Sequence, residues 1–301
     1  MLAYIFETMF SLVYKVSIYG GFILLLLLLT LYYYQDRMLY VTNMPSPEMK
    51  LPEQNPETFK SPTEHEMEFE DVYVTTKDHI KLHGWFIKTE QDPKSNPTII
   101  FFHANAGNIG FRLPNIVGLV KKSEVNVLIV GYRGYGHSQG KPTEADLKMD
   151  TQSVFDWALE HEQINNDKIY LFGRSLGGAV ATYLASKTQD KIKGLILENT
   201  FTSIPDMVDH IFKYLSALKG LILRIEWNSL ELIKELKVPI LFISGQADQL
   251  IPPFQMQTLY SNAKKSVKTE MMEIEHGTHN ESWMQAGDVY FHRIKDFCHE
   301  K

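Results

Sequence analysis

The sequence has almost no cysteine. Cys298 is the one cysteine among 301 residues, so no disulfide can form within the chain and no site built on several thiolates can hold a metal. Its thiol falls in the expected last helix, where cysteine usually serves as a small apolar side chain. His276 and His279 lack the spacing of a helical ligand pair and have no second cluster of ligands nearby. We therefore expect neither a metal nor another cofactor.

The sequence also lacks an excess of positive charge. Its 30 Lys and Arg residues are outnumbered by 36 Asp and Glu residues, which gives a net charge of −6. A protein that binds nucleic acid needs cations to neutralise the phosphates. Nucleic acid is therefore excluded as an expected partner. With 44% hydrophobic residues, the chain can instead bury a sizeable single core.

Charge is missing altogether from residues 16–35, which include an unbroken leucine run at 24–29. A helix of this length would be about 30 Å long, which is the thickness of a bilayer core. Tyrosines at both ends, among them Tyr14 and Tyr33, are typical of an interfacial aromatic belt. The apolar stretch is too long for a cleaved signal peptide and lacks small residues at its end. We expect residues 1–40 to be a membrane anchor, with its transmembrane helix at about 16–35.

The charges that flank this span do not assign a side of the membrane, because Lys15 before it is nearly balanced by Arg37 and Lys50 after it.

Residues 41–64 then carry prolines at positions 45, 47, 52, 56 and 62. Such a segment, with little hydrophobic periodicity, predicts an extended tether at the membrane surface. The folded domain is expected at residues 65–301.

Within this domain, predicted strands alternate with predicted helices. The strands are expected at residues 68–76, 80–88, 98–103, 125–131, 169–172, 192–198, 238–244 and 268–274. Alternation with short loops is typical of a mostly parallel sheet that is covered by helices on both faces. Residues 200–237 interrupt the alternation and predict a short helical cap. Its apolar residues, such as Phe212, Leu215 and Leu221, are candidates for an acyl-binding surface.

The most informative motif is Gly173-Arg-Ser-Leu-Gly177, which lies between an apolar strand and a helix rich in small residues. The pattern G-x-S-x-G needs both glycines, because a sharp turn brings the backbones of strand and helix too close for a β-carbon. The turn exposes the serine hydroxyl beside the free N–H groups of a helix N-terminus. We predict that Ser175 is a nucleophile.

A serine hydroxyl becomes a good nucleophile when a histidine takes its proton and a carboxylate orients that histidine. Two acids follow predicted strands, Glu198 and Asp248, and two histidines, His276 and His279, follow the last one. Because the carboxyl ends of parallel strands share one edge of a sheet, all four can approach Ser175. We favour Asp248, whose turn opens with a glycine. The residues alone leave both histidines open.

The reaction also needs two N–H groups that stabilise the oxyanion. The residue after the nucleophile, Leu176, supplies one of them. The loop after His103 supplies the other, because small residues at positions 104, 106 and 107 allow its backbone to turn tightly. We predict Asn105 as this donor, with Ala104 as the alternative.

Six parts of the chain resemble one known family. They are Phe102–Gly110, Tyr132–Gly136, Leu171–Val180, Glu198–Phe201, Ser244–Gly245 with Asp248–Pro253, and Gly277–Asn280. In these parts the sequence is similar to the Bem-type membrane-anchored serine hydrolases of the α/β-hydrolase superfamily. The resemblance implies the α/β-hydrolase fold and a triad of Ser175, Asp248 and His279. Ala104 departs from the glycine that is usual in the family.

The resemblance also implies an activity, since related proteins are described as removing palmitoyl groups from protein cysteines. The expected function is that of a membrane-anchored palmitoyl-protein hydrolase, with an acylated protein as substrate and the bilayer as partner. A lipid esterase, such as a lysophospholipase or monoacylglycerol lipase, is the first alternative. A non-catalytic membrane scaffold is the alternative from another class. A serine nucleophile argues against epoxide hydrolysis, which uses aspartate.

Overall fold

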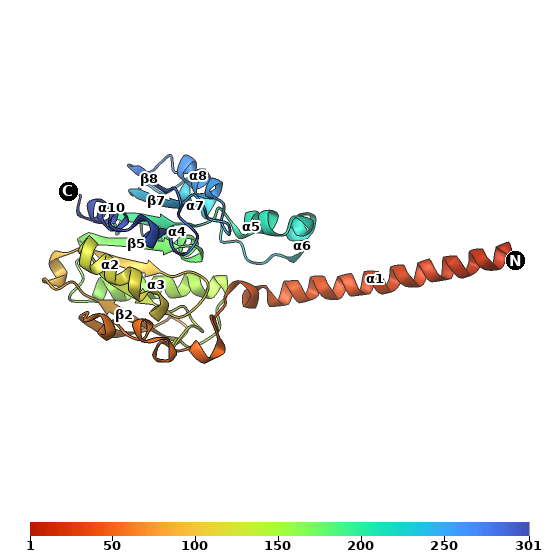
Figure 1. Ribbon diagram of the computed structural model, residues 1–301, viewed down its shortest axis with the longest axis horizontal. Coiled ribbons are helices and arrows are strands. Elements are labelled where there is room, and N and C mark those ends of the chain that lie inside the picture. The colour runs from red at the N-terminus through yellow and green to blue at the C-terminus, as the bar shows by residue number, and fades with distance from the viewer. Residues whose placement is uncertain (301) are drawn as a thin grey trace.

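A single long helix, α1 (Leu2–Leu39), projects from a domain of mixed helices and strands (Figure 1). The computed structural model describes residues 1–300, apart from the side chains of Leu2, Ala3 and Leu215. The stretch Tyr4–Leu39 is long and apolar enough to cross a membrane. At 1.5 Å per residue the helix is about 57 Å long. It is therefore longer than a bilayer core, and its last turns reach the domain.

Within residues 1–300, eight strands form one sheet in the order β1-β2-β4-β3-β5-β6-β7-β8. The strands are β1 (Phe69–Thr75), β2 (Lys81–Ile87), β3 (Thr98–Phe102), β4 (Asn126–Val130), β5 (Ile169–Arg174), β6 (Gly194–Glu198), β7 (Ile240–Gly245) and β8 (Thr269–Ile274). β2 pairs antiparallel with β1 and β4, and all other pairs are parallel. The mostly parallel sheet predicted from the sequence is confirmed.

Helices cover both faces of this sheet. The longer ones are α2 (Leu113–Ser123), α3 (Glu144–Glu160), α4 (Leu176–Thr188), α8 (Pro253–Asn262) and α10 (Asp288–His299), and α9 (Ser282–Ala286) is short. Along β3, Ile99 and Phe101 pack in the core beneath α2 and α10, whereas Ile100 and Phe102 pack in the core beneath α3 and α4. Successive side chains of a strand point to opposite faces. This is why the central strands are continuous apolar runs.

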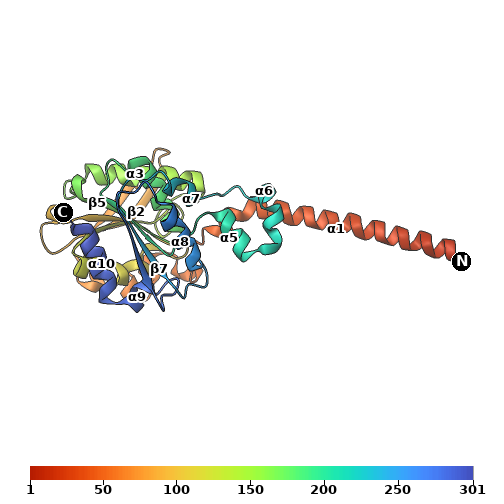
Figure 2. The same ribbon diagram turned by 90° about the horizontal axis from the view of Figure 1, so that it is seen from above.

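The cap lies between β6 and β7. It consists of α5 (Ile204–Ile211), the 3₁₀ helix Lys213–Leu218, α6 (Lys219–Ile222) and α7 (Ser229–Ile233). In both views α5 and α6 extend beyond the sheet to lie beside the domain end of α1 (Figures 1 and 2). Phe212 and Leu221 are 48% and 75% exposed there. The side chain of Leu215, which we also named as an acyl-binding candidate, lies outside the described part of the chain.

Residues 41–64 are not the extended tether that the prolines predicted. They form four 3₁₀ helices, Pro47–Met49, Pro52–Gln54, Glu57–Phe59 and Pro62–His65. Three of these begin with proline, whose fixed φ suits the first position of a helical turn. Asn55 is buried and exchanges two side-chain hydrogen bonds with Asn108, at 2.8 and 3.0 Å. The prolines therefore fold the segment onto the domain.

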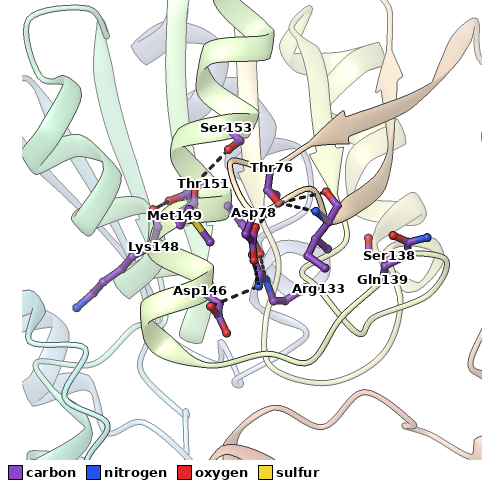
Figure 3. A network of polar contacts seen from close by, with 12 residues as sticks. Thr76, Asp78, Arg133, Ser138, Gln139, Asp146, Lys148, Met149, Thr151 and Ser153 are labelled. Carbon is purple, nitrogen blue, oxygen red and sulfur yellow. Dashed lines mark hydrogen bonds and ion pairs between the residues drawn. The ribbon is translucent and has the colours of Figure 1, made fainter.

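A buried arginine fixes the loop that follows β4 (Figure 3). Arg133 donates from Nε to Asp150 at 2.7 Å and from a terminal nitrogen to Asp78 at 3.0 Å, and it lies 3.3 Å from Asp146. Its hydrogen bonds to Asp150 and Asp78 raise the pKa of Arg133. Because Asp78 belongs to the β1–β2 turn and Asp150 to α3, the ion cluster joins three parts of the chain behind the loop that carries Tyr132.

The turn between β5 and α4 brings two backbones into direct contact. Its corner residue, Ser175, has φ +55° and ψ −123°, a conformation that is costly for any residue with a side chain. A β-carbon at Gly173 would overlap the backbone of Gly177, and one at Gly177 would overlap the carbonyl group of Phe102. Glycine is therefore required on both sides of the serine.

This contact predicts a large loss of stability for Gly177→Ala. Overpacking usually costs about 1–3 kcal/mol, and a clash with rigid backbone belongs at the upper end, which corresponds to a fall of roughly 5–10 °C in Tm. Gly220→Ala is the control, because a β-carbon at Gly220 meets nothing within 4 Å. Thermal unfolding in detergent measures both. An unchanged Tm for Gly177→Ala would contradict the packing described.

Candidate active site

Ser175 lies at the domain surface nearest the cap, but only 5% of it is exposed. Its N–H donates to the carbonyl oxygen of Glu198 at 3.0 Å, and its own carbonyl oxygen accepts from the hydroxyl of Thr200 at 2.7 Å. The end of β6 therefore holds the strained turn from both sides. Strain of this kind persists only where the surroundings over-determine it.

The structure brings Ser175, His279 and Asp248 together although they are far apart in sequence. Nε2 of His279 lies 3.0 Å from the Ser175 hydroxyl oxygen, and Nδ1 lies 2.7 Å from Oδ2 of Asp248. The other carboxylate oxygen of Asp248 accepts from the N–H groups of Leu250 and Ile251, at 2.8 and 2.9 Å. With Nδ1–H donated to the carboxylate, Nε2 is the basic nitrogen that faces the serine.

The two rival residues are not part of this arrangement. Glu198 is fully buried, and its Oε2 accepts from Arg174 and from the hydroxyl of Tyr290, both at 2.8 Å. These partners turn the carboxylate toward α10, because Tyr290 belongs to that helix. His276 is exposed at the surface. The arrangement thus joins Asp248 and His279, the residues that we favoured from the sequence and the resemblance, and their catalytic roles stay a prediction.

The two predicted oxyanion donors also lie beside Ser175. Asn105 and Leu176 line the same cavity as the serine. Within residues 1–300, neither backbone N–H donates to a protein acceptor, so both can receive a negatively charged oxygen. The carbonyl oxygen of Asn105 accepts from the N–H of Val41 at 3.0 Å and from the hydroxyl of Tyr135 at 2.7 Å. Their role in catalysis stays a prediction.

A buried histidine supports the loop that carries Asn105. His103 lies 2.7 Å from the carbonyl oxygen of Ala104 through Nδ1, and its Nε2 accepts from the N–H of Tyr132 at 3.3 Å. This pattern requires a neutral ring with its proton on Nδ1. Burial, together with the nearby Arg112 guanidinium, lowers the pKa of His103 to about 3. The ring therefore stays neutral at physiological pH.

Asn199, which the sequence analysis did not single out, connects the loops that carry Asp248 and His279. Its side-chain amide donates to the carbonyl oxygens of Thr278 and His279, both at 3.1 Å, and accepts from the N–H of Gly245 at 2.7 Å. The residue has φ +45°, which asparagine tolerates better than most residues. An asparagine directly after a buried strand, at the edge where the catalytic loops meet, was the available signal.

An apolar cavity of about 330 Å³ extends from this group of residues. Ser175 and Leu176 lie at its inner end, and cap residues such as Met207 and Ile222 form its sides. Binding sites for small molecules usually combine such apolar walls with a few polar groups. Here mostly apolar side chains surround the hydroxyl of Ser175, so the cavity suits a molecule with a reactive polar group and a long apolar part.

The fold and the site define an α/β hydrolase. Residues 97–224 match the family described as alpha/beta hydrolase fold. Among solved structures, the esterase Pf2001 of Pyrococcus furiosus is similar, with a TM-score of 0.64 and 21% identity over 79% of this chain and 92% of that one. Est1E of Butyrivibrio proteoclasticus has a TM-score of 0.60 and 20% identity over 75% of this chain and 96% of that one. At such identities the likeness shows the fold.

Relatives of known sequence identify the family within the α/β hydrolases to which the chain belongs. Protein bem46 of Schizosaccharomyces pombe is 40% identical over 251 residues, 83% of either chain. The α/β hydrolase domain-containing protein WAV2 of Arabidopsis thaliana is 36% identical over 85% of either chain. The uncharacterized membrane protein YNL320W of Saccharomyces cerevisiae is 39% identical over 80% of this chain and 83% of that one. The chain belongs to the Bem46-type family of α/β hydrolases, as the motifs predicted.

Replacing Asn199 tests its positioning role. Asn199→Ala removes four side-chain hydrogen bonds, one of them to the hydroxyl of Ser282. It leaves the Gly245 N–H without its partner, which costs about 1–3 kcal/mol. We expect the rate of Ser175 modification by a fluorophosphonate to fall at least tenfold because His279 is no longer held in place. Asn166→Ala, at an exposed site, is the control. A wild-type rate for Asn199→Ala, in protein that is still folded, would contradict the role.

His103 predicts a stability that depends on pH. In the unfolded chain a histidine binds a proton near pH 6.5, whereas in the folded chain His103 stays neutral until about pH 3. Its contribution is complete above pH 6.5 and is lost as the pH falls, by up to about 1.4 kcal/mol per pH unit. Comparing Tm between pH 7 and 4 for wild type and His103→Asn isolates this loss. Parallel curves for the two proteins would contradict it.

Proposed function

We propose that the protein is a membrane-anchored serine hydrolase that cleaves long-chain acyl thioesters or esters through an acyl-enzyme on Ser175. The observation that carries the proposal is the line of contacts from Asp248 through His279 to Ser175, at 2.7 and 3.0 Å, at the inner end of an apolar cavity. Such a relay activates a serine, and the cavity suits an acyl chain.

In the proposed reaction, Nε2 of His279 takes the proton of the Ser175 hydroxyl while its oxygen attacks the acyl carbonyl carbon. The N–H groups of Leu176 and Asn105 stabilise the oxyanion, and each such donor contributes about 3–4 kcal/mol at the transition state. The carbon–sulfur or carbon–oxygen bond then breaks, and His279 protonates the leaving thiol or alcohol. Water, deprotonated by His279, releases the acyl group as a carboxylic acid and restores the serine.

We favour palmitoyl groups on protein cysteines as the substrate, because α1 is apolar enough to anchor the domain at a bilayer, where such groups reside. The catalytic domain would then be held at the membrane by one span. Lipid esters, such as lysophospholipids and monoacylglycerols, are the second candidate. They offer the same acyl chain to the same cavity and differ in the leaving group. The residues that surround Ser175 act on the part that both substrates share.

A non-catalytic scaffold is the competing proposal, and the geometry argues against it. The positive φ of Ser175 costs stability, and so do the N–H groups of Leu176 and Asn105, which have no protein acceptor within residues 1–300. A protein that uses the fold for binding alone gains nothing from these features. Catalysis, by contrast, depends on both of them.

The test combines labelling with turnover. Wild-type protein should react with a fluorophosphonate and should hydrolyse a palmitoylated peptide faster than a lysophospholipid in the same detergent. Ser175→Ala should lose both activities, and His279→Ala should slow them by several orders of magnitude. No labelling of wild type would favour the scaffold. A preference for the lysophospholipid would instead identify a lipid esterase, and a preference for short acetyl esters would overturn the long-chain substrate.

A further inference from the structure

The anchor helix is itself part of the wall of the active-site cavity. Besides Ser175 and the cap, the cavity is lined by Leu31, Gln35, Met38 and Leu39 of α1. Their spacing of i, i+4, i+7 and i+8 describes one face of a helix. The last two turns of α1 therefore present one apolar face to the space above the nucleophile.

This face is held against the cap by Gln35, a polar residue near the end of α1. Gln35 is 8% exposed, and its amide makes three bonds to the cap. Its Nε2 donates to the carbonyl oxygen of Ile222 at 3.0 Å, and its Oε1 accepts from the N–H groups of Arg224 and Ile225 at 2.7 and 3.1 Å. Every polar atom of the side chain is thus used, so the wall is fixed.

A surface ion pair strengthens the same junction. Arg224 lies 2.9 Å from Asp36 and donates from Nε to the carbonyl oxygen of Tyr32 at 3.0 Å. Its guanidinium also lies over the ring of Tyr32. Alone, an exposed pair of this kind contributes little. Together with Gln35 it fixes the rotation of α1, so that the face with Leu31 and Met38 looks into the cavity.

The same end of α1 contacts the oxyanion loop. The side chain of Asn105 donates to the carbonyl oxygen of Leu39 at 3.1 Å, and the N–H of Val41 donates to the carbonyl oxygen of Asn105 at 3.0 Å. The anchor thus borders the cavity from its outer part to the predicted oxyanion donor. The end of α1 therefore contacts the loop of Asn105 directly, without a flexible linker between them.

The outer part of the cavity faces the region where a bilayer would begin. Ile211 and Phe212 line the cavity and are 46% and 48% exposed, so the cavity reaches the surface between α5 and α1. α5 and α6 lie beside the domain end of α1 (Figure 2), and Leu221 of α6 is also exposed. Exposed apolar side chains beside a membrane helix are a surface for lipid.

From these contacts we propose that the final turns of α1 are one wall of the acyl-chain site, and that a long acyl chain reaches Ser175 from the bilayer along this helix. The inference rests on the proposed function. It adds the path by which the acyl chain reaches Ser175 and the residues that select the length of that chain. A chain that passes from the membrane between α1 and α5 keeps its methylene groups in apolar surroundings throughout. Leu31, near the outer part of the cavity, then limits the length of the acyl chain that the cavity can hold.

The test compares two leucines of α1 that differ in the face they occupy. Leu31 lines the cavity, whereas Leu29, two residues earlier and about 200° around the helix, is 43% exposed and lies outside the lining. Leu31→Trp narrows the cavity, Leu31→Ala widens it, and Leu29→Trp is the matched control. The full-length protein is placed in lipid nanodiscs and treated with an ethyl or a hexadecyl fluorophosphonate. The measured quantity is the ratio of the two labelling rates at Ser175.

We expect Leu31→Trp to lower the hexadecyl-to-ethyl ratio at least tenfold. Leu31→Ala should keep or raise the ratio, and Leu29→Trp should leave it within twofold of wild type. Equal ratios for Leu31→Trp and Leu29→Trp, with wild type reactive toward both probes, would overturn the anchor wall and leave the serine hydrolase intact. If wild type reacts with neither probe, the proposed function fails, and the inference that rests on it fails too.

Discussion

The contact between Gly177 and the carbonyl group of Phe102 is the constraint on which the site depends. It lets α4 start directly above β3, so the N-terminus of α4 lies beside the loop that leaves that strand. As a consequence, Leu176 at the start of the helix and Asn105 in the loop line the same cavity. The same contact forces Ser175 into its strained conformation. The predicted nucleophile and the predicted oxyanion donors thus depend on one packing requirement.

A second constraint lies at the boundary between α1 and the domain. Gln35, a polar residue near the end of α1, is buried against backbone groups of the cap. A buried amide without partners would cost several kcal/mol in a membrane setting, so these bonds fix where α1 meets the cap. The segment after α1 then folds onto the domain instead of extending from it. α1, the cap and the loop that carries Asn105 therefore form one structural unit.

Most of the fold could be predicted from the sequence, because strands such as 98–103 and 125–131 are apolar runs between turn residues. The positions of Ser175, Asp248 and His279 were also accessible, since strand order places their loops at one edge of the sheet. Asn199 was not, because its role depends on three backbone partners from distant loops. The folding of residues 41–64 was missed because prolines suit both an extended chain and the first turn of a 3₁₀ helix.

The contribution of α1 to the cavity wall could not be predicted from the sequence either. A hydrophobic run predicts a membrane span, and it does not indicate which other parts of the protein the helix contacts. Gln35 could be seen in the sequence, but its partners in the cap lie 187 to 190 positions away. Local patterns do not encode such separations. The contact of α1 with the cavity at Ser175 is therefore a property of the folded chain, and the proposed route of an acyl chain depends on it.

The most direct test of this account is an experimental structure of the full-length protein in a nanodisc after reaction with a hexadecyl fluorophosphonate. The account predicts phosphorus bonded to the hydroxyl oxygen of Ser175, a phosphoryl oxygen facing the N–H groups of Leu176 and Asn105, and the alkyl chain lying between the cap and the face of α1 that carries Leu31 and Met38. An alkyl chain that leaves the site away from α1, or phosphorus on another residue, would contradict it.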